Sequence, residues 1–140
     1  MKKLIFYILS LTWGSIMTLI GGIVALVLVC LNHRPSVHGG CLCFEVGYGW
    51  GAISLGLVII CSKSSADADT KNHEFGHAIQ NAILGPLFIV FVAIPSFVRC
   101  QYYNWMYTHN RKKYYTLPDY DSIWFEGGAT RLGEKYIKEW

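Results

Sequence analysis

The chain has 140 residues, of which 53% are hydrophobic and only 15% are charged. Soluble domains carry about 25% charged residues, so this composition indicates a membrane protein with no more than one folded domain. The net charge is only +3, and no basic stripe interleaved with aromatic residues is present, which argues against a nucleic-acid partner.

The first predicted element is a transmembrane helix over residues 4–31, which include no charged residue. A helix of that length rises about 42 Å, more than the roughly 30 Å hydrocarbon core of a bilayer. A signal peptide is the alternative because Lys2 and Lys3 form a basic start, but its apolar region would run only about 7–15 residues. We therefore predict a transmembrane anchor over residues 1–31, inserted in the lipid bilayer, and a folded domain over residues 32–140.

The next segment, residues 41–61, predicts a β-hairpin. Apolar residues alternate on both sides of a glycine-rich turn: Leu42, Phe44 and Val46 before it, and Ile53, Leu55, Leu57 and Ile59 after it. Alternation with period two is typical of strands that bury one face. Glu45 and the glycines argue against a second membrane span.

A helix of about four turns follows, beginning near Asp69 or Thr70 and ending at a Gly-Pro pair. It contains the string His73-Glu74-Phe75-Gly76-His77. Residues four apart project from the same helix face, so His73 and His77 can bind one zinc ion. Glu74 lies beside them and can take a proton from a water that zinc has activated. The alternative is an ordinary amphipathic helix whose two histidines face solvent by accident.

Residues 86–98 are apolar but number only 13, fewer than the roughly 20 that a span requires. They predict a short buried helix, or a segment that dips into the bilayer and turns back at Pro95. Residues 99–121 are rich in Tyr and Trp, as at a membrane–water interface.

The last segment, residues 122–140, predicts a helix capped by Asp121 or Ser122. It carries Glu126, the best candidate for the third protein ligand that a catalytic zinc site requires. Thr130 lies four residues later on the same face, where it can hydrogen-bond a ligand imidazole or Glu126 itself. The alternative is a surface carboxylate near a helix N-terminus.

A zinc site formed by His73, His77 and Glu126 constrains the topology of the chain. A single crossing of the bilayer between residues 77 and 126 would place these ligands on opposite sides. We therefore expect that residues 86–98 do not cross the membrane.

The two motifs together resemble the gluzincin metallopeptidases. They read His73-Glu74-x-x-His77 and Glu126-x-x-Ala129-Thr130-Arg131-x-Gly133. The nearest branch is the membrane-embedded one, with prenyl-protein proteases and HtpX-like proteases, which carry Asp where Thr130 stands. The pattern over residues 54–133 is also similar to a group of small bacterial membrane proteins.

This resemblance implies a zinc-dependent peptidase of the bacterial plasma membrane, with Glu74 as general base and a peptide or protein substrate. It also implies an edge strand beside the cleft that pairs with an extended substrate. Residues Ser54, Leu55 and Gly56 are our candidates for that strand. Residue type alone makes His109, Tyr114, Tyr115 and Tyr120 candidates for stabilising the oxyanion, and no spacing in the sequence selects one of them.

We therefore expect an α+β fold: an N-terminal transmembrane helix, then a small zincin-like domain with a β-hairpin, the helix of the His-Glu-x-x-His motif, a short apolar helix and a Glu-bearing helix. The predicted function is peptide-bond hydrolysis. The alternative is a non-enzymatic membrane protein or binding module with a structural or vestigial zinc site. Glu74 separates the two hypotheses, because a structural site does not need a general base.

Overall fold

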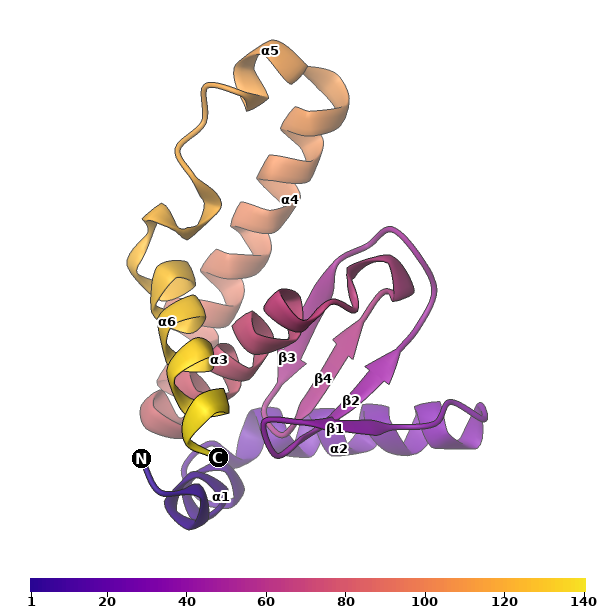
Figure 1. Ribbon diagram of the computed structural model, residues 1–140, viewed down its shortest axis with the longest axis vertical. Helices are drawn as coiled ribbons and strands as arrows, with labels where there is room; N and C mark the ends of the chain where they lie inside the picture. Colours follow the sequence, from indigo (N-terminus) through magenta and orange to yellow (C-terminus); the bar gives the residue numbers. More distant parts are fainter.

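The chain folds into N-terminal helices, a four-stranded mixed sheet and C-terminal helices, which is the predicted α+β class (Figure 1). The computed structural model describes residues 1–140. Its main elements are α1 (Lys3–Leu11), α2 (Ser15–Cys30), β1 (Ser36–His38), β2 (Cys41–Glu45), β3 (Ala52–Leu55), β4 (Val58–Cys61), α3 (Ala68–Leu84), α4 (Ile94–His109), α5 (Arg111–Tyr114) and α6 (Trp124–Glu139). Short helical segments lie at Lys63–Ser65, Ile89–Ala93 and Tyr120–Ser122.

The predicted continuous helix over residues 4–31 is wrong, because the chain bends by 87° between α1 and α2. Contacts with α3 hold the bend in place. The side-chain amide of Asn81 donates to the Gly14 carbonyl at 3.1 Å, and the Trp13 indole donates to the Ile83 carbonyl at 3.2 Å. No single helix is long and apolar enough to cross a membrane, although α1 and α2 together could do so by length and composition.

The strand order is β1-β2-β4-β3, with β2 parallel to β4 and the other two pairs antiparallel. The predicted hairpin between residues 41–46 and 53–59 is therefore wrong, because β4 lies between β2 and β3. Gly56 adopts a φ of 65° and forms a tight turn that divides the predicted second strand into β3 and β4. Ser54 and Leu55 lie on the edge strand β3, whereas Gly56 lies in the turn.

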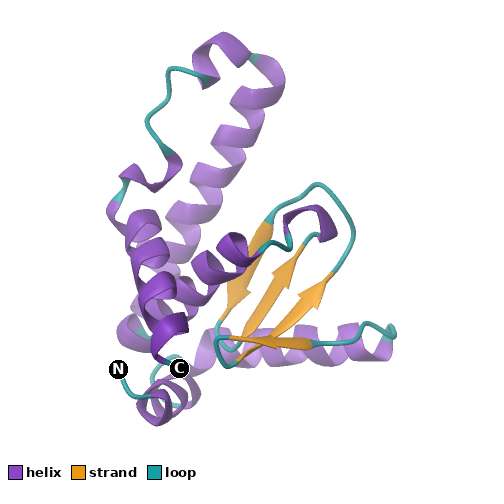
Figure 2. Cartoon of the chain, viewed as in Figure 1, coloured by secondary structure: helices purple, strands orange, loops and turns teal.

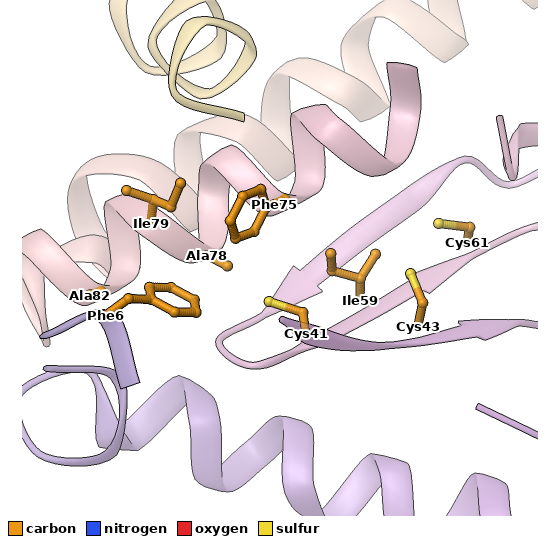
Figure 3. Packing of buried hydrophobic residues seen from close by; sticks show 9 residues of the cluster. All are labelled: Phe6, Cys41, Cys43, Ile59, Cys61, Phe75, Ala78, Ile79 and Ala82. Carbon is orange, nitrogen blue, oxygen red and sulfur yellow. The ribbon is translucent and has the colours of Figure 1, made fainter. Parts of the chain in front are cut away.

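Two helices cover opposite faces of this sheet. On β4, Ile59 and Cys61 face α3, whereas Val58 and Ile60 face α2. The cluster on the α3 side contains Phe6, Cys41, Cys43, Ile59, Cys61, Phe75, Ala78, Ile79 and Ala82 (Figure 3). The sheet is thus the middle of three layers, with α2 on one side and α3 with α6 on the other (Figure 2).

Of the two structures predicted for residues 86–98, the turn at Pro95 is wrong, and the helix is present but longer than predicted and buried only at Phe88 and Val92. A π-helical turn, Ile89–Ala93, continues into α4, and Pro95 lies in the first turn of that helix. A proline ring crowds the carbonyl four residues earlier, and a wider π turn at that point relieves the crowding. The helix therefore continues through the Tyr- and Trp-rich segment as far as His109.

Helices α3 and α6 touch through their backbones. A Cβ added at Gly76 would collide with the Ala129 carbonyl, and one added at Gly133 would collide with the Asn72 carbonyl. These two glycines bring the helix carrying the His-Glu-x-x-His motif against the helix carrying Glu126.

We expect Gly76→Ala to lower the free energy of unfolding by about 3 kcal/mol or more, because the added methyl group meets backbone that cannot rotate away. The matched control is Gly22→Ala on α2, where an added Cβ has no neighbour within 4 Å. It should raise stability by up to about 1 kcal/mol through helix propensity. Denaturant unfolding of the two variants in detergent measures both changes in the free energy of unfolding, which should be opposite in sign. Equal effects would contradict this account of the helix crossing.

Candidate metal centre

The helix that carries the motif begins at Ala68, with Asp67 as its N-cap. The Asp67 carboxylate accepts hydrogen bonds from the backbone N–H of Thr70 at 2.8 Å and from its hydroxyl at 2.9 Å. These bonds lower the pKa of Asp67. The predicted start near Asp69 or Thr70 is therefore late by two or three residues.

His73, His77 and Glu126 meet where α3 crosses α6. The Nε2 atoms of His73 and His77 lie 3.1 Å and 3.3 Å from the same oxygen, Oε2 of Glu126. One ligand atom from each of the three residues lies within 4.8 Å of the others, so the group could hold a metal ion. His77 and Glu126 are buried, and His73 is half-buried.

A hydroxyl from α6 determines which nitrogen of His73 carries the proton. The Thr130 hydroxyl donates to the Asp121 carboxylate at 2.7 Å. Its oxygen then accepts from Nδ1 of His73, which lies 2.9 Å away. His73 therefore carries its proton on Nδ1 and presents the lone pair of Nε2 to Glu126.

A side-chain amide orients His77 in the same way. The Gln80 amide nitrogen donates to the Phe125 carbonyl at 2.7 Å, which assigns its oxygen as the atom facing His77. That oxygen accepts from Nδ1 of His77 at 2.8 Å. The Nε2 atom of His77 is therefore also directed at Glu126 with its lone pair.

Two imidazole lone pairs facing one carboxylate oxygen require a positive charge between them. A shared proton or a metal cation would supply it. Burial lowers the pKa of His77, but the carboxylates of Glu126 and Glu74 outweigh it and raise that pKa overall. Burial raises the pKa of Glu126, while the neighbouring imidazoles of His73 and His77 lower it by more.

The second carboxylate oxygen of Glu126 supports the same conclusion. Oε1 of Glu126 is buried and has no hydrogen-bond partner, and such an atom is costly unless a partner satisfies it. Two neutral imidazoles and one carboxylate are a donor set that zinc accepts. The residues present therefore fit a divalent metal ion.

Glu74 lies beside the triad, buried at the wall of a cleft of about 510 Å³. Burial raises the pKa of its carboxyl group, and the nearby imidazoles of His77 and His73 oppose this effect. A carboxylate with a raised pKa is a stronger proton acceptor than an ordinary glutamate.

The cleft distinguishes among the residues proposed for the oxyanion. Tyr120 lines it, whereas His109, Tyr114 and Tyr115 do not. Burial, followed by the nearby charge of Glu126, raises the pKa of the Tyr120 hydroxyl, so that the group remains a hydrogen-bond donor. Of the proposed substrate strand, Ser54 lines the cleft, while Leu55 and Gly56 lie outside it.

Two residues that orient the histidines are absent from the sequence-based assignment. Asp121 or Ser122 was expected to cap α6, but the N-cap residue is Ile123, which makes no side-chain cap, and Asp121 binds Thr130 instead. Gln80 follows His77 by three residues, a spacing that places both on one helix face and could have indicated their contact.

Comparisons with protein-family models, with curated proteins and with solved structures find no match to this chain. Its function is therefore inferred from the chemistry of this site.

Proposed function

We propose that this protein is a membrane-associated, zinc-dependent peptidase of the gluzincin type. One observation carries the proposal: two imidazoles with fixed tautomers and a buried carboxylate converge on one point, with Glu74 beside them in a cleft. His73, His77 and Glu126 would hold the metal. An ion at this point would act as a Lewis acid that polarises the scissile carbonyl and acidifies water.

Residues of the chain would transfer the proton, stabilise the developing charge and orient the metal ligands. Glu74 accepts a proton from the attacking water as the new C–O bond forms, and returns it to the amine nitrogen as the C–N bond breaks. The Tyr120 hydroxyl donates a hydrogen bond to the carbonyl oxygen, where negative charge develops. Thr130 and Gln80 keep the two imidazoles from rotating.

The geometry of the cleft favours an extended peptide as substrate. Strand β3 lines it, is at the edge of the sheet and pairs only with β4, so its outer side is free to pair with another strand. The cleft runs from there to the π turn before α4, whose Val92 and Ala93 provide apolar surface for substrate side chains.

The proposal is tested by metal analysis of the purified full-length chain together with hydrolysis of a broad peptide library. Near-stoichiometric zinc with Glu74-dependent cleavage would support it. Zinc without Glu74-dependent cleavage would favour a structural metal site in a non-enzymatic protein. Absence of bound zinc would contradict both functions.

We expect Asp121→Asn and Thr130→Val each to weaken zinc binding by about 10–100-fold, because His73 loses the partner that fixes its ring. Competition with a chromophoric chelator measures this effect without any assay of activity. Asp119→Asn is the matched control, because the structure uses only the backbone carbonyl of Asp119, as acceptor for Arg99. Unchanged affinity in both test variants would show that the hydroxyl bridge does not support the metal.

A further inference from the structure

Helices α2 and α4 each carry an exposed apolar stripe. On α2 the stripe is formed by Leu19, Ile23 and Leu26, and on α4 and the π turn before it by Val90, Ile94 and Phe97. Each of these six side chains is more than half exposed. The spacing of four and then three residues places each trio on one helix face. Stripes of this size mark a surface that another body covers.

The two stripes begin close to each other in the fold. Helix α2 covers the sheet face opposite α3, and its first turn lies against the segment that leads into α4, where Met17 packs against Phe88 and Val92. In Figures 1 and 2, much of α4 and of α2 is drawn fainter than α6, so both helices lie toward the far side, with α4 rising up the view and α2 running across it. We call the six side chains together the apolar face.

Charge indicates which partner covers the apolar face. Residues 1–44 and 86–118, which contain both helices, hold no Asp or Glu, and all nine acidic residues lie elsewhere. The same segments hold Lys2, Lys3, Arg34, Arg99, Arg111, Lys112 and Lys113. Arg99 is bound to the carbonyls of Asp119 and Tyr120, and the other six are exposed. An apolar surface on segments that carry cations and no carboxylate is complementary to anionic lipid headgroups above hydrocarbon.

The packing of α2 is incompatible with a transmembrane span. Its 16 residues rise about 24 Å, less than the roughly 30 Å of hydrocarbon. Its other side is buried, because Ala25 and Leu28 pack against Phe44, Val58 and Ile60 of the sheet. If α2 crossed the bilayer, the sheet would enter the hydrocarbon with the unpaired backbone groups of its edge strands, which lipid cannot satisfy.

We propose that the apolar face binds one leaflet of an anionic bilayer, with α2 and α4 lying along the interface and no segment crossing it. This inference does not depend on the metal site. It replaces the single transmembrane anchor that composition alone predicts. It also places residues before α1 and after α2 on the same side of the membrane.

The first experiment measures binding of the purified full-length chain, diluted from detergent, to preformed vesicles. Ile23→Glu on α2 and Ile94→Glu on α4 should each weaken binding by at least about tenfold, because each places a charge where the bound protein would bury an alkyl group in the bilayer. Tyr48→Glu is the control, since it adds the same charge at an exposed side chain of the β2–β3 loop. Vesicles containing phosphatidylglycerol should bind more tightly than vesicles of phosphatidylcholine alone.

The second experiment determines sidedness. Lys2→Cys and Ser36→Cys are made separately in a Cys30→Ser, Cys100→Ser background and treated on sealed vesicles with a membrane-impermeant maleimide. Equal labelling of the two sites is expected, and protection of one site alone would establish a span and overturn the proposal. Unchanged vesicle binding by Ile94→Glu would overturn it as well. So would a shift from dimer to monomer in both glutamate variants without loss of vesicle binding, since that would make the face a contact between copies.

Discussion

Replacing Glu74 by glutamine should lower the rate of peptide hydrolysis by about 10²–10⁴-fold and leave the zinc content of the protein unchanged. Glutamine has the same shape, but its amide cannot accept the proton of the attacking water or return it to the leaving amine. Loss of a general base typically costs about 10²–10⁴ in rate. Because Glu74 is not among the three residues that converge on one point, its replacement leaves the metal-binding group complete.

The measurement is kcat/KM on a cleaved peptide together with zinc per mole of the same preparation. Glu134→Gln is the matched control, because Glu134 also lines the cleft but lies outside the triad. It should retain most of the activity. Equal activity of Glu74→Gln and the unmodified chain would remove Glu74 from the mechanism and with it the main argument for an enzyme.

Replacing Glu126 by glutamine should remove the metal altogether. The change deletes the only anionic donor of the triad and leaves two neutral imidazoles. The loss of affinity should exceed the 10–100-fold expected for residues that only orient a ligand. An ion that binds the folded state raises the melting temperature by mass action. Without a bound ion, Glu126→Gln should therefore show no effect of a chelator on its melting temperature.

Thermal unfolding with and without a chelator provides this measurement independently of catalysis. The unmodified chain should melt at a lower temperature when chelator is present, whereas Glu126→Gln should melt at the same temperature in both conditions. Glu139→Gln on the same helix is the control and should behave like the unmodified chain. A chelator effect that persists in Glu126→Gln would assign the metal to other residues.

The features that the sequence predicts well depend on short-range regularities. His73 and His77 share a helix face because of helical periodicity alone, and the helix that carries them is present. The position of Glu126 was inferred from the donor types that zinc requires, and the structure brings this residue to the two histidines. A chemical requirement therefore linked two segments that are distant in the chain.

The features that the sequence does not predict depend on contacts between distant segments. The bend after α1 is held by hydrogen bonds of Asn81 and Trp13, which join the turn between α1 and α2 to α3. No local sequence pattern encodes that contact. The insertion of β4 between β2 and β3 is equally invisible to alternation, because all four residues of β4 are buried and a central strand covered on both faces does not alternate. Asp121 acts on His73 only through the Thr130 hydroxyl, which bonds both residues once the chain has folded.

The contact of α3 with α6 at Gly76 and Gly133 has a consequence for metal exchange. Carbonyl groups meet the opposing helix without intervening side chains, so no rotamer change can widen the separation between the histidines and Glu126. The apoprotein should thus be preorganised, with little conformational entropy lost when an ion enters. We expect metal to leave and return without unfolding, so that chelated protein regains full zinc content on simple dialysis.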